Sequence, residues 1–274
     1  MTVASPTLAR VPLGGGTLLV HPPRHPVLEL VLVLGLSLGQ SAVYSILRLL
    51  DLLTRHVALQ QQTTTLNNTV IPDRPWLDLL YQIAGVIFPV VPALLAIYLL
   101  SLSHRRPTHV IGLDLRRPRF DAALGALLAL GIGVPGLGLY LLARALGLDT
   151  TIAAGNLDPS WYAIAIYVLS ALGNGVLEEV IMIGYLYTRL GALTTAWPWV
   201  KRLIVIVGVS ALIRGSYHLY QGFGGFIGNL IMGVIMGLVF LRWRRVTPLV
   251  IAHTLLDVAA FVGYAVLAPH VNWL

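Results

Sequence analysis

Seven long apolar runs constrain the fold of this chain more than any other feature. A helix needs about 20 residues to cross a bilayer, and each run approaches or reaches that length. The predicted spans are Val27–Leu50, Leu79–Ser101, Ala122–Leu142, Trp161–Ile181, Leu203–His218, Gly225–Leu241 and Pro248–Ala268. Charged residues make up only 11% of the chain, against about 25% in a typical soluble domain. The sequence therefore predicts an all-α, polytopic membrane helix bundle with about seven transmembrane helices.

The same runs indicate a single transmembrane domain over residues 27–268. The segment before it, residues 1–26, contains several prolines and the run Gly14–Gly16, a composition that predicts a flexible cytoplasmic tail. Residues 51–78 connect the first two spans and include the polar stretch TTTLNNT. We expect this connection to carry no regular structure of its own.

Basic residues are distributed unevenly over the two sets of loops. With the N-terminus in the cytoplasm, 13 arginines and lysines fall in inner segments and 3 (Arg55, Arg74 and Arg144) in outer ones. Such an excess marks the cytoplasmic side of a membrane protein. The sequence thus predicts a multi-pass protein of the inner (plasma) membrane with a cytoplasmic N-terminus. Because this topology also explains the net charge of +7, the charge does not argue for a nucleic-acid partner. Lys201 is the only lysine, a bias that we interpret as bacterial.

Two adjacent carboxylates, Glu178 and Glu179, interrupt the fourth apolar run. An acid at mid-membrane costs roughly 2.5–3.5 kcal/mol on insertion scales, so acids there are rare and usually functional. The pair is therefore the first candidate for chemistry. Any side chain that can pair with it, or be activated by it, becomes a candidate as well.

Further polar side chains lie inside the later spans. Arg214 precedes His218 by four residues, and His253 precedes Asp257 by four, so each pair shares one helix face. Together with the two glutamates, these charged groups would cost on the order of 10 kcal/mol if they faced lipid, comparable to the net stability of a domain. We therefore expect one polar cluster built from three helices.

Three segments in a fixed order carry a resemblance: EEVIMIG (Glu178–Gly184), RGSYH (Arg214–His218) and HTLLD (His253–Asp257). They resemble the motifs of the CPBP family of intramembrane proteases, which includes type II CAAX prenyl endopeptidases and bacterial relatives tied to bacteriocin processing or self-immunity. The resemblance covers residues 161–257 and leaves the first three spans unmatched. It implies an endopeptidase that hydrolyses a peptide bond of a membrane-associated peptide or protein substrate.

The resemblance also implies a role for each of five residues. Glu178 would be the general base that activates water, and Glu179 would support it. His218 and His253 would position the water or stabilise the developing oxyanion. Asp257 would orient His253.

The match departs from the family pattern at two positions. Family members usually have arginine where this chain has Ile183, and phenylalanine where it has Arg214. We predict that the cation has moved to another helix, so that Arg214 is the charge partner of Glu179.

The residues leave other functions open. On the acids alone, a proton- or cation-coupled carrier is as well supported as an enzyme. A non-catalytic scaffold or immunity protein of the same fold is a further alternative. His218, close to Tyr217 and Tyr220, would also suit an aromatic belt at the interface.

The sequence offers no clear cofactor site. Histidine and carboxylate side chains are ordinary zinc ligands, but no HExxH motif is present, and the resemblance favours a metal-free site. The chain has no cysteine, which excludes thiolate zinc sites and cysteine nucleophiles. We therefore expect no cofactor.

A count of residues from the membrane faces gives the candidate residues different depths in the bilayer. At 1.5 Å per residue, Glu178 and Asp257 come out near the cytoplasmic face, whereas His218 lies roughly 22 Å from it. On this count the site opens toward the cytoplasm, and His218 lies apart from the other residues.

Overall fold

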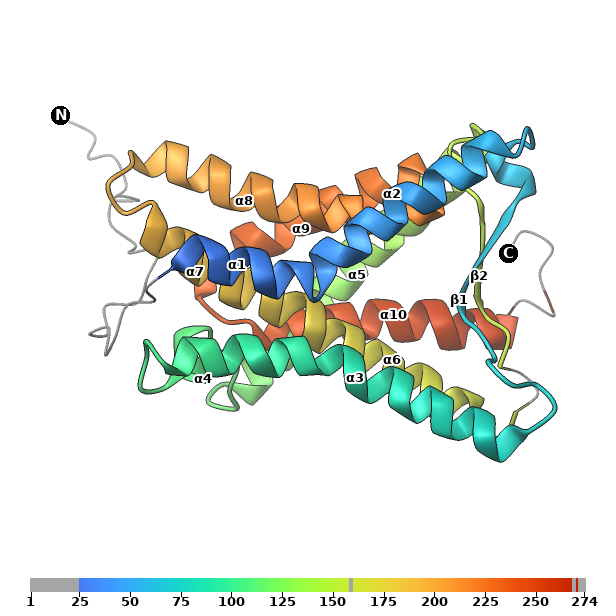
Figure 1. Ribbon diagram of the computed structural model, residues 1–274, viewed down its shortest axis with the longest axis horizontal. Coiled ribbons are helices and arrows are strands. Elements are labelled where there is room, and N and C mark those ends of the chain that lie inside the picture. The colour runs from blue at the N-terminus through green and yellow to red at the C-terminus, as the bar shows by residue number, and fades with distance from the viewer. Residues whose placement is uncertain (1–24, 158–159, 268–269, 271–274) are drawn as a thin grey trace.

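The computed structural model describes residues 25–157, 160–267 and 270, and its helices run along one long axis (Figure 1). Among these residues, six helices are long and apolar enough to cross a membrane, and a bent pair makes a seventh when counted as one span. The six are α3 (Pro75–Ser101), α5 (Pro118–Ala145), α6 with η2 and α7 (Ala163–Leu193), α8 with η3 (Trp199–Gln221), α9 (Phe223–Trp243) and α10 (Thr247–Leu267). The predicted all-α bundle is confirmed. Residues 1–24, most of the predicted tail, lie outside the described residues.

The first predicted span is the bent pair. Helix α1 (Pro26–Gly35) and helix α2 (Leu38–Thr54) meet at an angle of 50°. At the break, Ser37 donates its hydroxyl to the Val33 carbonyl (2.6 Å) and its backbone N–H to Leu34 (3.1 Å), bonds that compete with a continuous helix. The bend directs α2 away from the axis of α1 (Figure 1).

The polar connection after α2 carries structure, so that prediction is wrong. It contains a 3₁₀ turn, η1 (Leu59–Gln61), and a strand, β1 (Thr63–Asn67). Strand β1 pairs in parallel with β2 (Thr151–Gly155), from the connection between α5 and α6. The three consecutive threonines of β1 favour an extended strand, but its partner lies almost 90 residues away, so local composition could not reveal the pairing.

Helix α6 (Ala163–Glu178) runs through the middle of the bundle. It continues without a break through a wide π-helical segment, η2 (Glu179–Tyr185), into α7 (Leu186–Leu193). In the apolar stretch of this continuous helix (Ala163–Leu193) 61% of the residues are buried, against 6% in α5, so it is the central helix and α5 faces outward. The helix therefore extends well beyond Ile181, where the predicted span ends. All of η2 is buried, and π-helical turns of this kind often lie at functional sites.

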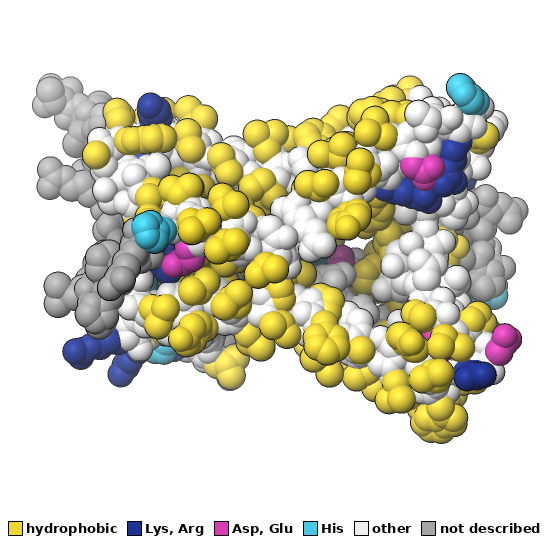
Figure 2. Space-filling view, in the orientation of Figure 1, with side chains coloured by type: hydrophobic (Ala, Val, Ile, Leu, Met, Phe, Trp, Pro, Cys, Tyr) yellow, Lys and Arg dark blue, Asp and Glu magenta, His cyan; other side chains and the backbone are white. Residues whose placement is uncertain are grey.

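Hydrophobic side chains cover the middle of the visible face, and charged side chains collect near its two ends (Figure 2). Two of the arginines assigned to inner segments are nevertheless buried in ion pairs. Arg189 bonds Glu29 of α1 (2.8 Å), and Arg245 bonds Asp121 of α5 (2.5 Å). Arg116 and Arg245 together hold the pKa of Asp114, in the loop after α4 (Pro107–Val110), well below its usual range. These arginines therefore stabilise contacts between helices, in addition to indicating, in the sequence prediction, the cytoplasmic side of the membrane.

Asp149, in the connection before β2, predicts a pH dependence of stability. The carboxylate is 2% exposed and accepts the N–H groups of Gly224 (2.8 Å) and Gly225 (3.2 Å) at the start of α9. Burial raises its pKa to about 6, against the lowering effect of the two backbone bonds. The folded state therefore holds this proton more tightly than the unfolded chain, a stabilisation that is present below about pH 4 and lost as the pH rises through about 6.

Asparagine at position 149 keeps an acceptor for the same N–H groups without the charge. The melting temperature of Asp149→Asn, minus that of the parent, should therefore increase as the pH rises from about 4 to about 7. Thermal unfolding in detergent at several pH values measures this difference. A difference that stays constant over the range would contradict it.

Candidate active site

The two glutamates lie where the central helix changes from α-helical to π-helical geometry. Glu178 ends α6 and Glu179 begins η2, midway along the 31-residue helix. Glu179 is completely buried, and Glu178 is 8% exposed. Charges at this depth need partners because desolvation is expensive. Helices α8 and α10 supply them.

Arg214, near the end of α8, joins both carboxylates. Its Nη2 donates to Glu179 Oε1 at 2.7 Å, and its Nη1 to Glu178 Oε2 at 3.4 Å. The side chain is fully buried. It can approach because α8 packs closely on α9: a Cβ atom added to Gly233 would lie 3.2 Å from Arg214 Cδ. The planar, five-donor guanidinium suits two acceptors better than an ammonium group would.

His253 on α10 contacts the same two acids. Its Nδ1 lies 2.8 Å from Glu179 Oε1, and its Nε2 lies 3.9 Å from Glu178 Oε2. Asp257 Oδ1 is 3.8 Å from Nε2, beyond hydrogen-bond distance, and Asp257 Oδ2 instead accepts the amide of Asn174 at 3.0 Å. The His253 ring therefore makes its direct hydrogen bond to Glu179, which accepts it, and not to Asp257 as expected. The spacing of four residues brings Asp257 close, but the ring turns to the nearer carboxylate on α6.

His218 completes the cluster from the turn between α8 and η3 (Leu219–Gln221). Its Nε2 lies 4.0 Å from Glu178 Oε2 and, among the described residues, is buried without a hydrogen-bond partner. Its Nδ1 lies 3.4 Å from the amide nitrogen of Gln221. The preceding residue, Tyr217, donates its hydroxyl to Glu178 Oε2 at 2.6 Å.

The simple residue count, which put His218 at a different depth from the other site residues, does not hold in the structure. Glu178 lies at the middle of a helix that continues to Leu193, about 22 Å from that end at 1.5 Å per residue. His218 lies about 28 Å from Trp199, where α8 begins on the same side. The two depths therefore agree to within about one helical turn. The sequence count failed because the apolar run ends before the helix does.

The histidine and carboxylate side chains of the cluster are of the types that can bind a metal. Within the described residues, no group of three or more histidine and carboxylate side chains is arranged to hold an ion. Both glutamates contact the Arg214 guanidinium, and Nδ1 of His253 faces Glu179. The residues do not fit a zinc site in this arrangement.

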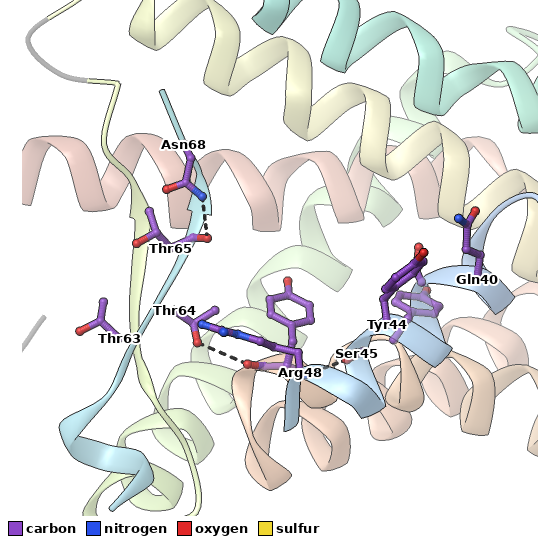
Figure 3. Close-up of a pocket in the computed structure, with 11 residues that line it drawn as sticks. Gln40, Tyr44, Ser45, Arg48, Thr63, Thr64, Thr65 and Asn68 are labelled. Carbon is purple, nitrogen blue, oxygen red and sulfur yellow. Dashed lines mark hydrogen bonds between the residues drawn. The ribbon is translucent and has the colours of Figure 1, made fainter. Parts of the chain in front are cut away.

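A cavity of about 690 Å³ lies beside the cluster. Helix α2 and strand β1 form two of its walls, and Tyr217 and Tyr220 line it as well. The visible face is hollowed between α2 and the central helices, with an acidic side chain visible inside (Figure 2). Figure 3 shows Tyr44 and Arg48 of α2 on one side of the cavity and the threonines of β1 on the other.

Tyr217 connects this cavity to the glutamates, because it lines the cavity and bonds Glu178. The residues that line the cavity come largely from α2 and β1, and β1 and β2 lie at the end of the bundle opposite α4 and its arginine-rich loops (Figure 1). We expected the site to open toward the arginine-rich end of the bundle. This cavity borders β1, at the other end, and does not provide that opening. The bend of α2 and the ordered strand, neither of which the sequence predicted, create it.

Residues 159–259 match the family described as type II CAAX prenyl endopeptidase Rce1-like. The matched segment holds all the residues of the cluster. This part of the chain is an Rce1-like domain. The resemblance predicted over residues 161–257 is thereby confirmed, and with it a protease family whose members act on peptide or protein substrates at the membrane. No curated protein and no solved structure matches the chain. Together with its apolar helices, the domain makes the chain a multi-pass membrane protein.

The sequence interpretation missed two contacts of the Rce1-like domain. Tyr217 bonds Glu178, whereas the sequence suggested only a place in an aromatic belt; it follows Arg214 by three residues, a spacing that brings side chains together at a helix end. Asn174 precedes Glu178 by four residues, one turn earlier on α6, and reaches Asp257. In both cases the spacing to a known candidate was the available signal.

Proposed function

We propose that this chain is an intramembrane endopeptidase in which Glu178 activates the water that hydrolyses a peptide bond. The observation that carries the proposal is the arrangement around Glu178 Oε2. Nε2 of His218 lies 4.0 Å away and Nε2 of His253 lies 3.9 Å away. These separations are too long for direct hydrogen bonds and suit one bridging water. Such a water would lie next to a carboxylate that can take its proton.

The two histidines take different roles in this proposal. The Glu179 carboxylate that pairs with Arg214 accepts hydrogen bonds, so Nδ1 of His253 donates to it, and Nε2 of His253 can accept a hydrogen bond from the water. Gln221 donates to Nδ1 of His218, so neutral His218 carries its proton on Nε2. His253 therefore positions the water, and His218 donates to the oxyanion that forms on the substrate carbonyl.

The proton balance is complete with these groups. Glu178 removes a proton from the water while the oxygen of that water attacks the carbonyl carbon of the substrate. The carbonyl oxygen then becomes an oxyanion. When the C–N bond breaks, protonated Glu178 returns that proton to the leaving amine. Tyr217 and Arg214 hold the carboxylate in place throughout.

The test is a cleavage assay with a panel of labelled peptides in detergent, with and without a chelator. The proposal expects cleavage at internal bonds that persists in the chelator. Failure of the chain to cleave any peptide would contradict it and favour a non-catalytic role for the same fold. Cleavage that the chelator abolishes would overturn the metal-free mechanism.

The orientation in the membrane is part of the proposal. We infer an inner-membrane protein, bacterial in origin, with the arginine-rich loops and the N-terminus in the cytoplasm. Single cysteines in this cysteine-free chain test it. The labelled positions must be exposed to the reagent. Polar residues such as Ser103 (1% exposed) and Thr64 (6% exposed) are therefore unsuitable.

Asp73, in the connection after β1, and His109, near the end of α4, are exposed. In intact cells, Asp73→Cys should react with an impermeant thiol reagent, and His109→Cys should react only after lysis. The opposite labelling pattern would reverse the orientation.

A further inference from the structure

One edge of strand β1 remains open. The N–H of Thr151 donates to the Gln62 carbonyl at 2.9 Å, and Thr151 is in register with Thr63. Alternate residues of a parallel strand bond to the neighbouring strand, so the backbone of Thr64 faces β2, and the backbone groups of Thr63 and Thr65 face away from it. In agreement, the Thr65 carbonyl accepts the side-chain amide of Asn68 at 3.3 Å. Among the described residues the sheet has two strands only, so no strand pairs with this edge, although the Asn68 side-chain amide contacts it.

The open edge borders the cavity beside Glu178. Thr63, Thr64 and Thr65 all line it, as does Tyr217 (Figure 3). The strand is also tied to the turn that follows His218, because Thr64 Oγ1 donates to the Tyr220 carbonyl at 3.3 Å. A segment bound along β1 would therefore lie against the element that holds the proposed oxyanion donor.

The cavity also has a charge preference. Arg48 extends from α2 toward Thr64 (Figure 3). It shares Asp51 with Arg55, each at 2.5 Å. Two cations against one carboxylate leave a net positive charge at this wall, which favours a ligand with an acidic group.

We propose that the substrate binds as an extended peptide strand along the open edge of β1, with an acidic side chain beside Arg48. The inference rests on the proposed endopeptidase function and adds how the substrate is recognised. Backbone N–H and C=O groups of a peptide are the partners that an open edge selects, as in other cases of strand addition. The interior of a helical segment would have no such groups to offer, because its N–H and C=O groups bond each other within the helix. The substrate thus has to unfold locally before it reaches Glu178.

The experiment compares variants on one peptide, chosen from the panel because the parent cleaves it. Thr65→Pro removes an N–H that points away from β2 and places a ring on the open edge, where a paired strand would lie. Loss of one or two strand hydrogen bonds, at about 0.5–1.5 kcal/mol each, predicts a fall in kcat/KM of about 10-fold. Thr65→Val keeps the N–H and should have a higher kcat/KM than Thr65→Pro.

The matched control is Ala58→Pro. Ala58 lies in the same connection before η1, is exposed, and has a φ of −57° that suits proline. It does not line the cavity. Its kcat/KM should equal that of the parent, which separates the effect on the edge from a general effect of proline in this connection.

A second arm leaves the protein unchanged, so that it does not depend on the folding of Thr65→Pro. Peptides methylated at one backbone nitrogen at a time should lose about 10-fold in kcat/KM at every second position. A third arm exchanges each acidic residue of the peptide for its amide. Exchange of the acidic residue that binds beside Arg48 should raise the KM of the parent. The same exchange should leave the KM of Arg48→Gln unchanged.

The outcomes distinguish the two proposals. If the parent cleaves no peptide, the endopeptidase function fails and strand binding falls with it. If the parent cleaves but neither Thr65→Pro nor backbone methylation with a period of two lowers kcat/KM, strand binding alone is overturned. If the amide exchange affects parent and Arg48→Gln equally, Arg48 is not the partner of an acidic side chain.

Discussion

Arg214→Ala should abolish peptide cleavage and lower the stability of the folded chain. The guanidinium is fully buried and bonds both glutamates, at 2.7 Å and 3.4 Å. Removing one partner of a buried ion pair costs roughly 3–5 kcal/mol, because the remaining charges stay desolvated. Without the cation, the two adjacent acids would favour a protonated state, and the base would be lost. Thermal unfolding in detergent and peptide cleavage measure the two effects.

Two variants separate the charge of Arg214 from its shape and position. Arg214→Lys keeps the charge but cannot bond both carboxylates through one planar group, so it should fall between the parent and Arg214→Ala. The double variant Arg214→Phe with Ile183→Arg restores the residue types usual in the family and should recover part of the activity. An Arg214→Ala protein as stable and as active as the parent would refute the paired cluster.

Glu178→Gln should lower the rate of cleavage by about 10²–10⁴-fold, the usual loss when a general base is removed. Glutamine keeps an acceptor for Tyr217 and Arg214, which bond Glu178 at 2.6 Å and 3.4 Å. The melting temperature should therefore stay close to that of the parent. Loss of activity without loss of fold is the signature of a group that takes part in the chemistry.

Glu179→Gln provides the contrast. Glu179 Oε1 lies within hydrogen-bond distance of both Arg214 (2.7 Å) and His253 (2.8 Å), and the side chain is completely buried. Loss of its charge should lower the melting temperature more than Glu178→Gln does, while some cleavage remains because Glu178 is still present. Equal cleavage by Glu178→Gln and the parent, or a complete loss in Glu179→Gln alone, would reverse the two assignments.

The sequence predicted the membrane bundle because hydrophobic length is a property of each segment by itself. It also predicted a polar cluster, since the cost of unpaired charges in lipid leaves few other arrangements for Glu178, Glu179 and Arg214. The structure places these three side chains in contact, together with His253. The spacing of four residues correctly placed His253 and Asp257 on one face of α10, whereas His218 lies in the turn after α8 and not on the helix that holds Arg214.

The features that the sequence did not reveal are those that depend on distant segments. Strand β1 is ordered by β2, and the depth of His218 depends on how far α6 continues into α7. The i+4 spacing brought Asp257 near His253, but it could not show that Glu179 on another helix is closer to the ring. The location of the cavity follows from the bend between α1 and α2, which hydropathy alone does not encode.

The most direct test of the central claim compares the purified parent with Glu178→Gln on a single peptide, with the products identified by mass spectrometry. Matching melting temperatures would first establish that both proteins are folded. The account predicts that the parent releases two fragments from one internal bond, each with the mass expected for hydrolysis, and that Glu178→Gln releases them at least about 10²-fold more slowly. Equal rates of release from the two proteins, or no release from either, would contradict it.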